Sequence, residues 1–478
     1  MSPRRGRGRR ALATAFAALA TLGLAGCASF SADGGFGPVE QAARRHLDKS
    51  VQWPRSEAER ERVATRVREL LAAPLSMDAA VQLALLNNRG LQADFETLGI
   101  AEADRVQAGR LPNPGFAFSR LTRGDEVELE RSLHFDLARL LAWPQAQRIE
   151  QRRFEQAQGV AATRVLALAA DTRRAWVQAV AAEESVRYAT QVMRAAEAGA
   201  ELARRMAQVG NFTRLQQLRE QGFYADAALG LARARQAQQS TRERLTRLLG
   251  LWGADTMLRL PERLPELPAA PREQPDIERL ALAQRLDVQG MRLALEQTAR
   301  ELGLTQATRW VNVLELGFAH SRSNEEATQR GWEIGFELPL FDFGQARTAR
   351  AEARYRQALQ QAAATAIDAR SEVREAYGAY RTAWDVARHH RDELVPIRQR
   401  VAEENVLRYN GMLIGVFELL ADARAQIAGV NAAIDALRDF WLAQAELDLA
   451  LVGPPNLAAA AALSGAPAAS AEAGGAGH

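Results

Sequence analysis

The chain has 478 residues, of which 47% are hydrophobic and only 6% aromatic. Ala and Leu dominate the apolar share, which favours long helices packed at close range over a bulky globular core. The net charge of +3 includes five arginines without an acid in the first 27 residues, and the rest of the chain has 56 basic against 58 acidic side chains. The charge therefore indicates a basic targeting segment and argues against a nucleic-acid-binding surface.

Residues 1–26 are typical of a secretory signal peptide, because a basic head precedes the apolar run ALATAFAALATLGLAG. This run is shorter than the about 20 residues that cross a bilayer. It ends in Leu24-Ala25-Gly26-Cys27, which resembles a bacterial lipobox, whose cysteine is diacylated. Two acyl chains (palmitate or similar) anchor a protein stably. By resemblance to bacterial lipoproteins, Ala28 favours sorting to the outer membrane, and the alternative is an ordinary signal peptide with an incidental cysteine.

Cys27 is the only cysteine in the chain, so no intrachain disulfide is expected. Beyond it, the chain repeats itself at an offset of about 200 residues. LALLNNRGLQ (83–92) resembles LALAQRLDVQ (280–289), and GFAFSR (115–120) resembles GFAHSR (317–322). The sequence therefore predicts a lipidated segment, two repeats, a Pro-rich linker between them that cannot be helical throughout, and a disordered Ala/Gly tail. Their residues are 27–75 for the segment, 76–258 and 276–452 for the repeats, 259–275 for the linker and 453–478 for the tail.

Each half has the same predicted order of elements. A first helix covers 77–107 or 276–306, and two short strands follow. A very long helix then covers 145–208 or 345–408, and a turn at Gly210 or Gly411 precedes a last helix. At 1.5 Å per residue such a long helix approaches about 100 Å, so it needs neighbouring helices along its length.

The strands alternate with period two. In VNVLELGFAHS (311–321), Leu314, Leu316 and Phe318 share one face; in GWEIGFELPL (331–340), one face has Trp332, Ile334, Phe336, Leu338 and Leu340. On the opposite faces, positions 315, 317, 319, 333, 335 and 337 are Glu, Gly or Ala. The first half repeats this pattern in 115–120 and 129–137, with Arg131 as the misfit on the apolar side. The length of about 9–11 residues suits a tilted strand that crosses a bilayer. The alternative is a small soluble hairpin packed on helices.

Four strands cannot close a barrel, and an open edge in lipid leaves backbone groups without hydrogen bonds. The chain must therefore borrow strands from copies of itself. Three copies would give twelve strands, which is an allowed barrel size.

Residues 75–452 resemble the TolC family of outer-membrane efflux proteins. The resemblance rests on LSMDAAVQLALLNNRGLQ (75–92), QAGRLPNP (107–114), ELPLFDFGQARTARAEARYRQA (337–358) and RYNGMLIGVFELLADARAQI (408–427). It implies a mainly α fold with a small β part, in a trimer with a twelve-stranded outer-membrane β-barrel and a twelve-helix periplasmic tunnel. It also implies a passive exit duct for efflux or type I secretion, which is not an enzyme and works with a periplasmic adaptor and an inner-membrane pump.

The resemblance implies adaptor contacts at two helix–turn–helix tips. These tips are Val209-Gly210-Asn211 and Asn410-Gly411-Met412. Glycine suits such a turn because it tolerates positive φ. An equally simple interpretation is that these residues only cap helices.

The family often narrows the periplasmic mouth of the tunnel with acids in a pattern like LDVLDA. The matching segment is FELLAD (417–422), in which Glu418 falls on the first acidic position. Ala421 falls on the second acidic position, and Asp422 lies one residue further along. The sequence therefore leaves open whether a second acidic ring exists. Three copies of Glu418 around one axis would attract cations, although Glu418 also fits a solvated helix acid.

The sequence indicates neither catalysis nor a cofactor. The six histidines fall in no metal-ligand spacing, and no GxxxxGK[ST] loop or GxSxG elbow occurs. Two other interpretations remain: a coiled-coil lipoprotein without a pore, and a periplasmic adaptor, although the matched halves and the hairpins argue against both. The exported substrate and the pump it serves are not encoded in any motif.

Overall fold

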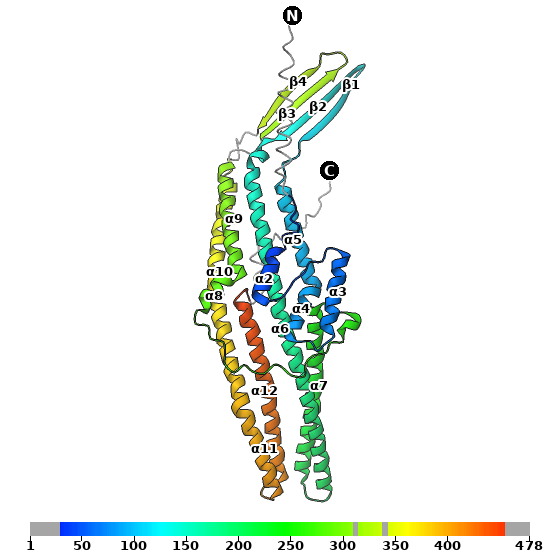
Figure 1. Ribbon diagram of the computed structural model, residues 1–478, viewed down its shortest axis with the longest axis vertical. Helices are drawn as coiled ribbons and strands as arrows, with labels where there is room; N and C mark the ends of the chain where they lie inside the picture. Colours follow the sequence, from blue (N-terminus) through cyan, green and yellow to red (C-terminus); the bar gives the residue numbers. More distant parts are fainter. Residues whose placement is uncertain (1–28, 309–313, 337–342, 455–478) are drawn as a thin grey trace. The chain divides into compact units, whose positions relative to one another are not determined.

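The computed structural model describes residues 29–308, 314–336 and 343–454 (Figure 1). They divide into two compact units. Unit 1 collects the segments up to Gly37, Glu96–Gly159 and Gln289–Ala364, and unit 2 collects Pro38–Phe95, Val160–Val288 and the chain from Thr365 onward. The predicted mainly helical fold with a small antiparallel sheet is confirmed. Cys27, the signal peptide and the C-terminal tail from residue 455 lie outside the described residues.

Unit 1 contains the sheet. Its strands β1 (Gly115–Arg123), β2 (Glu126–Asp136), β3 (Leu314–Ser323) and β4 (Gln329–Phe336) are antiparallel in the order β1-β2-β3-β4 (Figure 1). They lie where the period-two pattern predicts them, and the predicted strand residues 311–313 and 337–340 fall outside the described residues. Because β2 pairs with β3, the hairpins of the two halves form one continuous sheet.

Four long helices contribute residues to both units: α5 (Arg89–Ala108), α6 (Leu137–Gln208), α9 (Leu286–Thr308) and α10 (Gln345–His389). Helix α6 begins eight residues before the predicted start, and it continues through Pro144. The last residue of β2 explains this early start. The Asp136 carboxylate accepts a hydrogen bond from the Arg139 N–H at 2.8 Å, which caps the helix as soon as the strand ends.

The other helices belong mainly to unit 2. They are α2 (Gly37–Leu47), α3 (Glu57–Leu71), α4 (Met77–Asn87), α7 (Arg214–Leu249), α8 (Ile277–Gln284), α11 (Val395–Asn410) and α12 (Val416–Ala450), with a short 3₁₀ turn η1 (Gly253–Thr256) and a π turn η2 (His390–Leu394). Helices α2 and α3 fall in the segment 27–75, for which the sequence predicted only lipidation. The π turn interrupts the predicted helix 345–408 and separates α10 from α11.

The first predicted helix of each half is broken, so the expectation of one continuous helix in each was wrong. Asn88 and Arg285 take extended backbone angles, with ψ of 118° and 126°. The Asn88 amide donates to the Leu248 carbonyl at 2.9 Å and caps α5 through Leu91. Arg285, 1% exposed, binds Asp287 and Glu372 at 2.7 Å each. Long-range contacts of polar side chains therefore outweigh local helix propensity at both breaks.

The Pro-rich linker 259–275 contains no helix, and tryptophans hold it in unit 2. The indole N–H of Trp384 donates to the Pro268 carbonyl, and that of Trp441 to the Pro265 carbonyl, both at 3.0 Å. Buried Trp384 also packs with Phe440 and Leu267 in one apolar cluster. A proline offers only its carbonyl to a hydrogen bond, and the indole N–H supplies a donor without adding charge.

Candidate functional site

The strand register aligns apolar side chains across the whole sheet. Phe116 faces Leu133, Leu133 faces Phe318, and Phe318 faces Trp332. Exposed fractions of 68% for Phe116, 49% for Phe318 and 69% for Trp332 show that nothing among the described residues covers this row. An exposed apolar surface of this kind marks a contact with lipid or with another protein. The alternative of a soluble hairpin packed on helices is therefore not what the fold contains.

The opposite face of the sheet is polar. Most of its other residues are Gly, Ala or Ser, and six are acids: Glu126, Glu128, Glu130, Asp136, Glu315 and Glu333. Ser321 donates to Glu128 at 2.5 Å, and Ser132 and His134 share a hydrogen bond of 2.8 Å. The predicted alternation of an apolar face and an acidic face is confirmed.

Both edges of the sheet are open among the described residues. β1 pairs only with β2, and β4 pairs only with β3. An open edge presents a row of backbone N–H and C=O groups that must find partners outside this chain if the sheet enters lipid.

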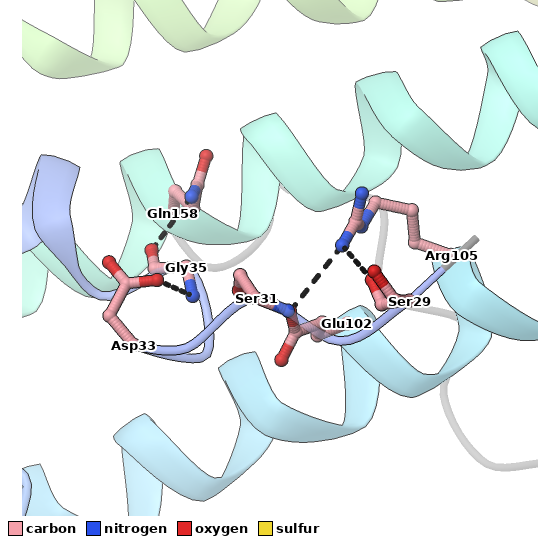
Figure 2. A network of polar contacts seen from close by, with 7 residues as sticks. All are labelled: Ser29, Ser31, Asp33, Gly35, Glu102, Arg105 and Gln158. Atoms are coloured by element: carbon pink, nitrogen blue, oxygen red, sulfur yellow. Dashed lines mark hydrogen bonds and ion pairs between the residues drawn. The ribbon is translucent and has the colours of Figure 1, made fainter.

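Residues 29–37 are held against the helices that lead into the sheet. Figure 2 shows the segment 29–37 between α5 and α6. The Ser31 N–H donates to the Glu102 carboxylate at 2.7 Å, and Glu102 is only 4% exposed. Arg105 binds the same carboxylate at 3.4 Å and reaches the Ser29 carbonyl at 3.5 Å. This network fixes a segment that begins two residues after Cys27.

A tight turn completes the segment 29–37, here called the anchoring segment. The Asp33 carboxylate accepts hydrogen bonds from the backbone of Gly37 and Gly35, at 2.9 Å and 3.0 Å, and the bond from Gly37 is the largest cause of its lowered pKa. Gly35 has φ of +73°, and a Cβ there would lie 2.1 Å from a ring carbon of Phe154. Its carbonyl accepts from Gln158 at 2.7 Å (Figure 2). The Asp-Gly-Gly sequence at 33–35 was the available signal for this turn.

The first tip, between α6 and α7, obeys the local rules for ending and starting a helix. Gly210 takes φ of +78°, as predicted. The N–H groups of Gly210 and Asn211 close onto the carbonyls of Ala207 and Met206, at 3.2 Å and 2.8 Å, which is a Schellman motif. Thr213 and Gln216 then form a capping box for α7. Val209 is 71% exposed.

The second tip, between α11 and α12, departs from those rules. Gly411 has φ of −81°, so the expectation that it takes positive φ was wrong. Met412 occupies the left-handed position instead, with φ of +58°. The N–H groups of Met412 and Leu413 close onto Tyr409 and Arg408, at 3.0 Å and 2.8 Å. The Schellman motif is therefore one residue later than the sequence alignment of the two glycines indicated.

The predicted gate acids follow the second tip, and their surroundings differ. Glu418 lies in the first turn of α12 and is exposed. The partly buried Asp422 accepts a hydrogen bond from the Asn405 side chain of α11. Two residues on, Arg424 forms an ion pair of 2.5 Å with Glu220 of α7, which is 2% exposed. The Asp422 carboxylate thus holds α12 to α11, whereas Glu418 is left for solvent or for another copy.

Two further findings limit the chemistry of the described residues. No three His, Cys, Asp or Glu side chains among them gather closely enough to hold a metal ion. Within the same residues, none of the helices combines the length and the hydropathy that a membrane span requires.

In a comparison with known sequences, the chain is 26% identical over 291 residues to the cobalt-zinc-cadmium resistance protein CzcC of Cupriavidus metallidurans. The match covers 57% of this chain and 65% of that relative, so it spans slightly less than two thirds of its length. No family model matches the chain.

Solved structures show the same fold. A membrane protein from Pseudomonas aeruginosa matches with a TM-score of 0.68 and 20% identity, over 81% of this chain and 90% of that one. The outer-membrane protein VceC of Vibrio cholerae matches with a TM-score of 0.65 and 16% identity, over 84% of this chain and 100% of that one. The resemblance to the TolC family is confirmed at the level of the fold: this chain has the fold of solved outer-membrane channels such as OprN, which matches with a TM-score of 0.66 and 17% identity, over 82% of this chain and 91% of that one.

Proposed function

We propose that this chain is the outer-membrane exit duct of a tripartite efflux or type I secretion system, a passive conduit and not an enzyme. The observation that carries the proposal is the exposed apolar row from Phe116 to Trp332, with acids on the other face of the same strands. In water such a row would drive aggregation. In a bilayer it faces lipid, and the acidic face lines an aqueous lumen. A coiled-coil spacer without a pore, or an adaptor, has no use for this sheet.

The open edges support assembly with copies of the same chain. In lipid each unpaired backbone group costs several kcal/mol, so β1 of one copy must pair with β4 of the next. Three copies close a twelve-stranded barrel, and the helices of the two repeats continue as a twelve-helix tunnel in the periplasm. The fold shared with the outer-membrane channels supports this homotrimer.

A lipid anchor at Cys27 fits the anchoring segment 29–37. In the sequence only Ala28 separates Cys27 from Ser29, the first residue of this segment. Ser29 is held by Arg105, which lies in the last turns of α5 shortly before β1 begins. An acylated cysteine would therefore enter the membrane next to the strands that cross it. Measurement of the mass of the N-terminal peptide tests this, since an unmodified Cys27 would contradict the anchor.

The two tips are the proposed contacts for the periplasmic adaptor, through which the inner-membrane pump is coupled. At the second tip, Met412 is 93% exposed and Leu413 is 77% exposed. A strained, non-glycine backbone angle at an exposed apolar residue is typical of a site retained for binding. Val209, Gly210 and Asn211 supply the first contact, and Asn410, Gly411 and Met412 the second.

The cargo class proposed is cationic. On the lumen-facing side of the described strands, six acids stand against one arginine, Arg123. A lumen of one sign of charge concentrates ions of the opposite sign. The relative named as a cobalt-zinc-cadmium resistance protein agrees with a metal-cation cargo. Glu130→Gln with Glu333→Gln should lower the cation preference of the open channel, measured as a reversal potential in a salt gradient.

The duct is tested with purified full-length protein by its mass and by conductance in planar bilayers. A trimer with discrete conductance steps is expected. Phe318→Arg places a charge on the lipid-facing row, at a cost of about 2–4 kcal/mol per subunit at the midplane, and should abolish insertion. Ala319→Arg, on the opposite face of the same strand, is the matched control and should still insert. Equal insertion of both variants would contradict the assignment of the two faces.

A further inference from the structure

The apolar face of the sheet changes character toward the hairpin turns. Next to the row from Phe116 to Trp332, the register places Arg131 opposite His320, and His320 opposite Arg330. One row further, Arg120 faces Leu129, and Leu129 faces Arg322. Four arginines thus form one patch across all four strands, here called the basic band: Arg120, Arg131, Arg322 and Arg330.

The basic band lies at one end of the strands. Both hairpin turns, at 124–125 and 324–328, lie beyond it, and β2 continues into α6 at the other end of the sheet (Figure 1). Along the apolar face, from the end where β2 continues into α6 toward the hairpin turns, the apolar rows come first and the basic band follows them. In a strand that crosses a bilayer, that order places the band where the hydrocarbon region ends.

The four guanidinium groups of the basic band are exposed, and none forms an ion pair with any residue that the structure describes. Elsewhere, arginines such as Arg152, Arg242 and Arg424 pair with glutamates. The acids that flank Leu129 and Arg131 on β2, Glu128 and Glu130, point to the opposite face of the sheet. At this end of the sheet, the arginines therefore lie on the apolar face, whereas the neighbouring acids of β2 lie on the opposite face.

We propose that the basic band binds the phosphate groups of lipid headgroups in the leaflet at the turn end of the sheet. The proposal rests on the proposed function, because it needs the sheet to cross a membrane. Guanidinium groups bind phosphate with two parallel hydrogen bonds, and arginine side chains can lie along an apolar surface while the charged end stays in the interface. The apolar rows beside the band would contact the acyl chains of the same lipid.

The test uses full-length trimer in phosphatidylcholine nanodiscs, with diphosphorylated lipid A added in steps and bound lipid counted by native mass spectrometry. Wild type should retain lipid A in preference to its dephosphorylated form. An arginine near the surface contributes about fivefold to such binding, so Arg131→Gln with Arg330→Gln should weaken retention by about 25-fold. Arg123→Gln, at the same end but on the lumen-facing side, is the matched control and should retain lipid A as wild type does.

The outcomes separate the lipid site from the duct. Equal retention by the double variant and wild type, or equal retention of the dephosphorylated lipid, would overturn the lipid site. Displacement of lipid A by millimolar inorganic phosphate would assign the band to free anions and would also overturn it. Channel conductance is measured on the same preparations: a wild type that forms channels without lipid preference refutes only the band, whereas a wild type without channels refutes the duct.

Discussion

The two tips of unit 2 are built on the same backbone motif from opposite residue choices. The first tip has glycine at the left-handed position and a Thr213–Gln216 capping box. The second tip has methionine at the left-handed position and Gly415 as N-cap, without a side-chain cap. Glu418 stands where Gln216 stands, at the third position of the helix. With no hydroxyl at Gly415, Glu418 is not part of a capping box.

This difference separates a tip optimised for stability from one that departs from local rules. Natural proteins violate such rules chiefly where function requires it. A methionine in a left-handed conformation costs stability, the N-cap Gly415 forgoes a side-chain hydrogen bond, and both occur on the second tip. The second tip is therefore the stronger candidate for adaptor contact and for the gate.

The largest expected effect is that of Glu418→Gln on ion preference. One carboxylate stabilises a monovalent cation about 8 Å away in water by about 0.5 kcal/mol, so three that converge on one cation at that distance would contribute about 1.5 kcal/mol, which is about tenfold. Cation-over-anion preference, read from the reversal potential in a potassium chloride gradient, should fall by about that factor. Gln216→Glu is the control, because glutamate at that position can keep the capping box. Unchanged preference in Glu418→Gln would remove this side chain from the gate.

Substitution of the residues with positive φ at the two tips, Gly210→Met and Met412→Gly, should change the stability of the tips in opposite directions. Gly210→Met forces a side chain into φ of +78°, and the gain from a less flexible unfolded chain offsets part of the strain, leaving a loss of about 1 kcal/mol. Met412→Gly should stabilise the second tip by a similar amount. Hydrogen exchange of the last turns of α6 and α11 measures both. If Met412→Gly stabilises the tip but lowers export in cells that carry the pump and adaptor, the methionine is retained for contact.

How far the sequence predicted this molecule depends on the range of the interactions involved. The strands and their two faces followed from a period of two, which acts within each strand. The breaks at Asn88 and Arg285 did not, because their side chains bind residues far along the chain, such as Leu248 and Glu372. Docking of the segment 29–37 on Glu102 was missed for the same reason. The left-handed Met412 was missed because sequence alignment pairs the glycines, whereas the backbone places the motif one residue later.

Effects of at most the same size are expected from the helix caps. Thr213→Ala removes the hydroxyl that accepts from the Gln216 N–H, at a typical cost of about 1 kcal/mol to the start of α7. Gly415→Ser supplies the missing cap at the second tip, and since glycine is itself a fair N-cap the gain should be only a few tenths of a kcal/mol. Hydrogen exchange in the first turns of α7 and α12 measures both changes. Equal protection of the two helices in the unmodified protein would contradict the contrast in capping.

The smallest effect is a difference in acid sensitivity. Hydrogen bonds from Arg204 and Arg205 lower the pKa of Glu201, before the first tip, to about 2 from 4.5. Because the folded pKa lies below the unfolded one, its stabilising contribution is present above pH 4.5 and is lost as the pH falls through about 2. Hydrogen exchange at the end of α6 should therefore be slower in wild type than in Glu201→Gln at pH 5, and the difference should vanish below pH 2. At the second tip, counted from the residue with positive φ, Val406 and Leu407 stand in place of the two arginines and are exposed by 48% and 66%.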